Sequence, residues 1–196
     1  MALTAIALTA TNLRTAITAL APLVPEIQDD LGVGASLFGV LGMIPTAMFA
    51  IAAFALPGLK SRFTTSQLLM MAMLITAVGQ VLRVLGGPAS LVSGSVLALF
   101  AIGITNALLP LAVREYFPNR VGAMSTTYLT TSQVAQSLAP VVAVPLSVWA
   151  TQMGLTGWRW SLGSWALLGL VAALTWLPLL TTPAPRTGVA TPVPAM

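Results

Sequence analysis

Long apolar segments alternate with short polar ones along the whole chain. A bilayer core accommodates about 20 mostly apolar residues as one helix, and charges, prolines and glycines separate six such segments here. We place the six predicted spans at residues 3–25, 34–57, 66–85, 90–113, 121–149 and 160–180. The polar connections are short, so successive helices are predicted to be antiparallel neighbours. The pattern predicts an all-α membrane protein with six transmembrane helices.

The remaining segment, residues 181–196, reads "TTPAPRTGVATPVPAM" and is rich in Pro, Thr and Ala. It has too few large apolar residues to bury a core of its own. We therefore expect residues 1–180 to form one six-helix domain, and residues 181–196 to be a disordered tail or the start of a linker.

Composition supports a lipid environment and limits the chemistry. Hydrophobic residues make up 57% of the chain and charged residues 6%, with a mean hydropathy of +0.95, whereas soluble domains carry about 25% charged residues. The net charge of +4 comes from eight cations and four acids, too few for a nucleic-acid surface. The chain has no Cys and no His, so we expect no metal site and no cofactor.

Basic residues are distributed unequally between the two predicted sides of the membrane. One side carries Lys60, Arg62, Arg114, Arg120 and Arg186. The other side has Arg83 and Arg159 at its edges and carries the acids Glu26, Asp29 and Asp30. Trp149, Trp158 and Trp160 cluster on this side, as in an aromatic belt. Because cytoplasmic loops are enriched in Lys and Arg, both termini are predicted to be cytoplasmic.

An arginine stands inside the first span, in "NLRTAITAL". A charge at the centre of a bilayer is unfavourable by about 2.5–3.5 kcal/mol on insertion scales, and no predicted span contains a carboxylate to neutralise Arg14. Thr11, Thr15 and Thr18 are at helical spacing from Arg14, and Asn12 is nearby. This pattern favours a site for an anion or a strong hydrogen-bond acceptor. The alternative is an arginine that snorkels or bonds to carbonyl groups of a neighbouring helix.

The fifth span is unusually polar in its first two thirds. Its hydroxyls and amides belong to Ser125, Thr126, Thr127, Tyr128, Thr130, Thr131, Ser132, Gln133, Gln136 and Ser137. Tyr128, Ser132 and Gln136 recur at every fourth position, so they share a helix face that could line a wet cavity. For Ser and Thr, hydrogen bonding between helices is an equal alternative, whereas the cavity is favoured for Tyr128, Gln133 and Gln136.

Two further polar residues lie within predicted spans. Asn106 is an amide in the fourth span, and Pro110 frees a backbone carbonyl about one turn before it. Arg83, near the end of the third span, either snorkels to the headgroups or faces the mouth of a cavity.

The acids are absent from the predicted spans. Glu26, Asp29, Asp30 and Glu115 all fall in loops or at helix ends. An intramembrane hydrolase would therefore lack a general base, so we do not expect an enzyme, and a proton relay within the spans is not expected either.

Three segments resemble a known family. "NLRTAITALAPLVPEI", "NALLPLAVREYFPNRVGAMSTTYLTTSQ" and "GWRWSLGSWALL" resemble the cyanate permease and nitroimidazole transporter family of the major facilitator superfamily. The resemblance implies the N-terminal half of such a transporter, built from two inverted three-helix repeats, in a bacterial inner membrane. It also implies that Arg14, Asn106 and Tyr128 face a central cavity that takes small polar or anionic solutes.

The loop between the second and third spans departs from the superfamily pattern G-x-L-a-D-R-x-G-R-R. In "PGLKSRFTTSQ", Arg62 and Phe63 match, but Ser61 replaces the acid and Thr64 a glycine. The charge latch of the superfamily therefore lacks its acid in this loop. We regard Arg62 and Arg83 as candidate gate residues.

The leading hypothesis is one half of a secondary active transporter that works by alternating access. Its partners would be the lipid bilayer, a small solute and a second six-helix half, in the same reading frame or in a dimer. The alternative is an incomplete fragment or a non-transporting membrane scaffold. The candidate substrate-binding residues are Arg14, Asn12, Thr18, Asn106, Tyr128, Gln133 and Gln136.

Overall fold

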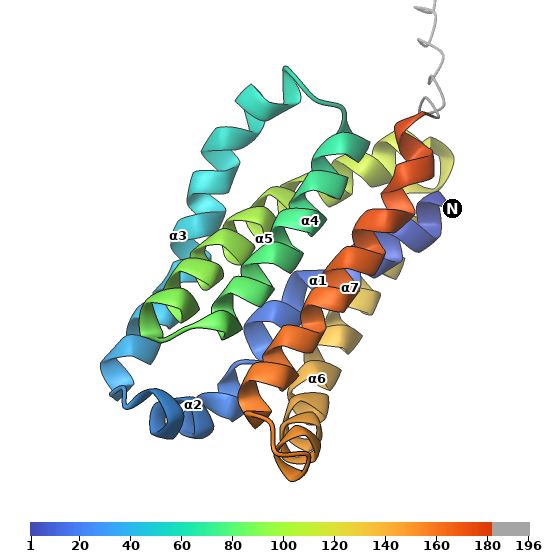
Figure 1. The fold of residues 1–196 in the computed structure, drawn as a ribbon. Helices are drawn as coiled ribbons and strands as arrows, with labels where there is room; N and C mark the ends of the chain where they lie inside the picture. Colours follow the sequence, from blue (N-terminus) through green and yellow to red (C-terminus); the bar gives the residue numbers. More distant parts are fainter. Residues whose placement is uncertain (182–196) are drawn as a thin grey trace, which may run out of the picture.

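The computed structural model describes residues 1–181, and this part of the chain is a bundle of helices without strands (Figure 1). Six helical segments in it are long and apolar enough to cross a membrane, which confirms the predicted fold class. The predicted tail, apart from Thr181, lies outside the described residues. The elements are α1 (Ala2–Thr18), η1 (Ala21–Leu23), α2 (Val24–Leu31), α3 (Ala35–Lys60), α4 (Thr65–Leu85), α5 (Pro88–Tyr116), η2 (Pro118–Arg120), α6 (Val121–Gln152) and α7 (Gly157–Leu180).

The first predicted span is interrupted. α1 ends at Thr18, and α2 begins only at Val24 after a short 3₁₀ turn. Pro22 explains the break, because it has no amide hydrogen and its ring conflicts with the carbonyl four residues earlier, that of Thr18. α2 then continues through the acidic segment expected to be a loop and ends at Leu31. It is capped by Gly32, whose positive φ of 63° suits glycine.

The most extensive helix contacts are those that α4 makes with α5 and α7. α4 packs against α5 and α7, α1 packs against α5, α6 and α7, and α3 packs mainly against α5. α4 and α5 approach closely because glycines face each other. A Cβ atom added to Gly79 would lie 2.6 Å from the backbone nitrogen of Ala98, and one added to Gly94 would lie 2.6 Å from the carbonyl oxygen of Gly79. Small residues allow such contacts in membrane bundles.

The connections alternate between the two ends of the bundle. Figure 1 shows the N-terminus and the end of α7 at the same end as the α3–α4 and α5–α6 connections, with α2 and the α6–α7 connection at the opposite end. This is the arrangement expected for six antiparallel spans. We call the first the terminal end and the second the distal end.

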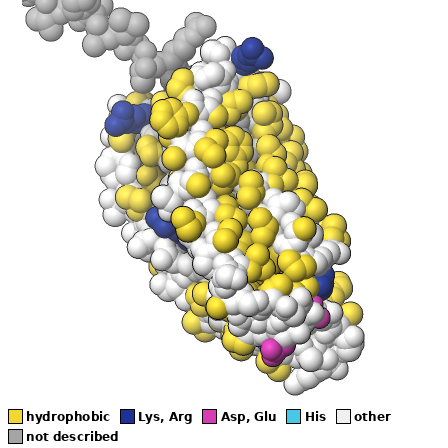
Figure 2. Space-filling model, turned by 90° about the vertical axis from the view of Figure 1, so that its left-hand side faces the viewer, with side chains coloured by type: hydrophobic (Ala, Val, Ile, Leu, Met, Phe, Trp, Pro, Cys, Tyr) yellow, Lys and Arg dark blue, Asp and Glu magenta, His cyan; other side chains and the backbone are white. Residues whose placement is uncertain are grey.

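Two helices are much less covered than the others. The most apolar window of α3 is 17% buried and that of α6 is 28% buried, against 61% for α5. Figure 2 shows one face of the molecule, where hydrophobic side chains run along its length and acids appear only near its lower end. The uncovered sides of α3 and α6 are suited to lipid or to another helical bundle rather than to water.

Candidate functional site

Arg14 lies on the less buried stripe of α1, with Thr11 and Thr18 one turn away on either side. Within residues 1–181, its guanidinium forms neither a hydrogen bond nor an ion pair, and both described ion pairs involve other cations. Among the described residues, no carboxylate forms an ion pair with Arg14. Five N–H donors remain available there to a solute.

The neighbouring threonines use their hydroxyl hydrogens within the helix. Thr11 donates to the carbonyl oxygen of Ala7 and Thr18 to that of Arg14, each at 3.0 Å. Thr15 is buried and donates to the carbonyl oxygen of Asn12. Because these donors are already engaged, Arg14 is the side chain of this stripe with free donors.

Asn12 faces the opposite way. It is fully buried, and its Nδ2 atom lies 3.1 Å from the Cβ position of Gly169 in α7. Two residues correspond to about 200° around a helix, so Asn12 and Arg14 cannot share a face. Neither atom of the Asn12 amide has a hydrogen-bond partner among the described residues.

The other predicted residues divide between exposed and buried positions. Asn106 of α5 and Gln133 of α6 are exposed, and Gln136 is half buried. Tyr128 and Ser132 are buried on the face of α6 that packs toward the bundle. The face predicted from every fourth residue therefore runs from the core at Tyr128 toward the surface at Gln136.

The many hydroxyls of α6 do not require a wet cavity. Four of them donate to carbonyl oxygens of their own helix, at distances of 2.9–3.1 Å: Thr126, Thr127, Thr131 and Ser137. Such local bonds satisfy hydroxyls in a helix whatever surrounds it. The remaining amides, Gln133 and Gln136, are the better indicators of a polar surface.

Arg83 is buried, with 3% of its surface exposed. Its Nη1 donates to the carbonyl oxygen of Ala16 in α1 at 2.8 Å, and its Nε has no hydrogen-bond partner among the described residues. The arginine therefore does not snorkel to the headgroups in this structure. It reaches from α4 to the end of α1, where the helix break leaves carbonyl groups without helical partners.

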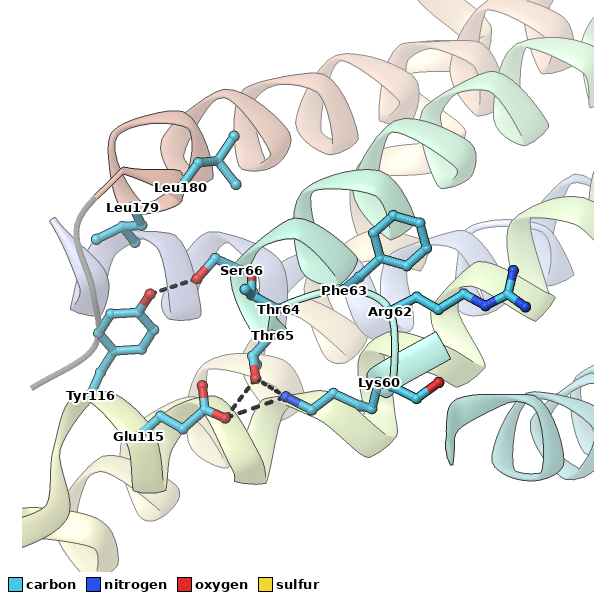
Figure 3. A pocket seen from close by; sticks show the side chains of 11 residues that line it. Lys60, Arg62, Phe63, Thr64, Thr65, Ser66, Glu115, Tyr116, Leu179 and Leu180 are labelled. Carbon is cyan, nitrogen blue, oxygen red and sulfur yellow. Dashed lines mark hydrogen bonds and ion pairs between the residues drawn. The ribbon is translucent and has the colours of Figure 1, made fainter. Parts of the chain in front are cut away.

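A polar cluster joins three helices at the terminal end (Figure 3). Thr65 donates to Glu115 Oε1 at 2.7 Å, and Lys60 Nζ lies 2.6 Å from the Thr65 hydroxyl and 3.5 Å from the carboxylate. The carboxylate missing from the α3–α4 loop is thus supplied by α5. Thr64, in place of the expected glycine, begins α4 through reciprocal hydrogen bonds with Gln67.

Arg62 is exposed in the α3–α4 turn beside this cluster. It helps to line an open pocket of about 520 Å³. Its role as a gate stays a prediction.

A second polar cluster, at the distal end, was not predicted from the sequence. Asp30 of α2 accepts hydrogen bonds from Trp158 at 3.0 Å and from Arg159 at 3.1 Å, and Glu26 accepts one from Ser147. Trp158 is buried, so it is not part of the predicted aromatic belt, whereas Trp149 and Trp160 are exposed. The predicted topology places these opposite charges on the same side of the membrane, and this shared placement could have indicated the cluster.

A family model, the Major Facilitator Superfamily, matches residues 6–195. The chain belongs to this superfamily.

Individual relatives agree with this assignment. The chain is 34% identical over 178 residues to the uncharacterized transporter YycB of Bacillus subtilis, covering 91% of this chain and 43% of that protein. It is 28% identical over 169 residues to the 2-nitroimidazole transporter of Escherichia coli, covering 86% and 42%. It is 26% identical over 170 residues to the cyanate transport protein CynX of Escherichia coli, covering 84% and 42%.

The chain therefore spans less than half the length of these Major Facilitator Superfamily relatives. This share fits the N-terminal half that the sequence motifs predicted.

Proposed function

We propose that the chain is one half of a secondary active transporter that moves a small polar or anionic solute by alternating access. The observation that carries the proposal is Arg14, a cation on the open stripe of α1 with no partner among residues 1–181. A charge in such a position is costly unless a polar group meets it. A solute that enters from outside is such a group.

The relatives support the solute class. Two of them are named for 2-nitroimidazole and for cyanate, which are both small and polar, and cyanate is an anion. Arg14 would hold the charged or strongly accepting end of the solute, while Asn106, Gln133 and Gln136 would donate hydrogen bonds to it. Tyr128 would act from the inner edge of this surface.

The membrane placement follows from the distribution of cations. Lys60, Arg62, Arg114 and Arg120 lie at or near the terminal end, so this end would face the cytoplasm of a bacterial cell. A second six-helix half would cover the exposed sides of α3 and α6. Rocking of the two halves would then open the solute site to each side in turn.

The test compares Arg14→Ala and Arg14→Lys in the transporter assembled with its second half. We expect Arg14→Ala to abolish binding of a small anion such as cyanate while the melting temperature is retained, because the substitution removes a charge without a partner. Arg14→Lys should restore binding poorly, since lysine lacks the planar fork of arginine. Equilibrium binding and a thermal melt measure both properties.

Arg114→Ala is the matched control, because Arg114 is exposed near the end of α5 and outside the proposed site. It should leave binding unchanged. Normal anion binding by Arg14→Ala with a much lower melting temperature would mean that Arg14 is a structural residue.

A further inference from the structure

A pocket of about 240 Å³ lies in the distal half of the bundle, between the end of α1 and the beginning of α3. It exists because α1 and α3 do not pack closely against each other, while both border α5. Leu20, Phe38 and Pro45 line it and are half exposed, so the pocket reaches the surface. Its other lining residues include Leu41, Ser95 and Arg83.

Arg83, the charged residue of this pocket, packs closely against Gly94 of α5. A Cβ atom on Gly94 of α5 would collide with the backbone nitrogen of Arg83 and would lie 2.7 Å from its Cγ. The absence of a side chain at Gly94 thus lets the arginine stem pass across α5. The guanidinium arrives beside Ala16, which also lines the pocket.

Arg83 retains donors for a further partner. Only Nη1 is engaged, with the Ala16 carbonyl, and Nε is buried without a partner among the described residues. No carboxylate is among the residues that line the pocket. Ser95 already donates to the carbonyl oxygen of Leu91 at 2.6 Å, so it can only accept. Arg83 is therefore the donor that the pocket offers to an anion.

We infer that this pocket binds a small organic anion with an apolar body, and that Arg83 contacts its charged end. The lining is otherwise largely apolar, which suits a hydrocarbon or ring rather than a hydrated inorganic ion. A monocarboxylate is the simplest ligand of this chemistry. The site is separate from the Arg14 stripe. This inference rests on the proposed function in one respect: the ligand belongs to the class of small polar or anionic solutes proposed there.

Gly42 of α3 provides a way to block the pocket without disturbing the packing. It lines the pocket, and a Cβ atom at Gly42 would meet nothing within 4 Å. We therefore expect the side chain in Gly42→Leu to narrow the pocket while Arg83 keeps its position. Gly39→Leu is the matched control, because Gly39 lies on the same helix, is equally open, and does not line the pocket.

The experiment measures binding of benzoate and its neutral analogue benzamide to the full chain in detergent, by calorimetry. We expect benzoate to bind the parent chain and Gly39→Leu equally, and benzamide to bind much more weakly. Gly42→Leu and Arg83→Met should each weaken benzoate binding about 10- to 100-fold. If Arg83→Met does not fold, the two glycine variants still decide the question.

Three results would overturn the inference: no benzoate binding by the parent chain, unchanged binding by Gly42→Leu, or equal binding of benzamide. Arg14→Ala separates this inference from the proposed function. It should retain benzoate binding. Loss of benzoate binding in Arg14→Ala would place the anion at Arg14, which would remove the pocket inference while favouring the proposed transport site.

Discussion

Arg159 of α7 and Asp30 of α2 form an ion pair of 3.1 Å at the distal end of the bundle. The same guanidinium donates from Nη1 to the carbonyl oxygens of Val84 and Gly86, at 2.7 and 2.9 Å. One side chain thus holds the beginning of α7, the end of α4 and the short helix α2 together. Cations suit this position, because helix C-termini carry a partial negative charge.

Replacing Arg159 with alanine is expected to lower the stability by about 1–3 kcal/mol, since three hydrogen bonds from a charged group are lost and part of their value is screened by solvent. The measurement is a thermal melt in detergent. Arg120→Ala serves as the control, because Arg120 is exposed. Equal melting temperatures for the two variants would contradict the role given to Arg159.

Gly94→Ala is expected to destabilise the bundle by at least about 1–3 kcal/mol, the range for inserting a group into a well-packed interior. The new Cβ atom would lie 2.6 Å from the carbonyl oxygen of Gly79, a backbone atom that cannot move aside easily. Gly39→Ala, at an open helical position, is expected to be neutral or to stabilise by up to about 1 kcal/mol. Comparable melting of the two variants would show that α4 and α5 are less close than described.

Asn12→Leu is expected to keep or raise the melting temperature. The side chain of Asn12 is fully buried and its amide has no partner among the described residues, so an apolar residue of similar size removes an unsatisfied group. Thr9→Val is the matched comparison. Thr9 is equally buried in α1 and accepts a hydrogen bond from Trp176 Nε1 at 2.9 Å.

The valine at position 9 leaves that indole N–H without its acceptor, and we expect a loss of about 1–3 kcal/mol. A large loss of stability in Asn12→Leu, as in Thr9→Val, would show that the Asn12 amide has a partner in the folded protein.

The chain alone is expected not to transport as a monomer. In the proposed transporter the solute lies between two halves, and the exposed sides of α3 and α6 need a covering surface. Uptake of radiolabelled cyanate into liposomes, with the oligomeric state measured in parallel, checks this. Uptake by a demonstrated monomer would contradict the two-half mechanism.

The number and type of the helices could be predicted from the sequence because the bilayer imposes one length scale on apolar segments. The ends of the helices could not. α3 continues to Lys60 and α5 to Tyr116, beyond the predicted ends at residues 57 and 113, because helical hydrogen bonding does not stop where the apolar residues stop. Pro22 indicated the break in the first span. It was missed because a count of apolar residues does not consider which residues lack a backbone N–H donor.

The candidate site was predictable in part. Thr11 and Thr18 share a stripe with Arg14, as their spacing predicted, whereas Thr15 is buried. Asn12 was grouped with Arg14 through sequence proximity, although two residues along a helix point in nearly opposite directions. The burial of Arg83 depends on Gly94, eleven positions later and on another helix, and only the packing of α4 on α5 shows that the two meet.

The two arginines set well inside the helices, Arg14 and Arg83, have no carboxylate partner in the described part of the chain. Two cations without a carboxylate partner contribute positive potential to the interior of this half, and such a field favours anions over sodium ions. A negative-inside membrane voltage acts on the same anions, with about 2.3 kcal/mol of electrical work per elementary charge for each 100 mV. A monoanion carried alone would consequently be driven outward, and its accumulation inside the cell would need coupling to a second ion, either a co-transported cation or an exchanged anion.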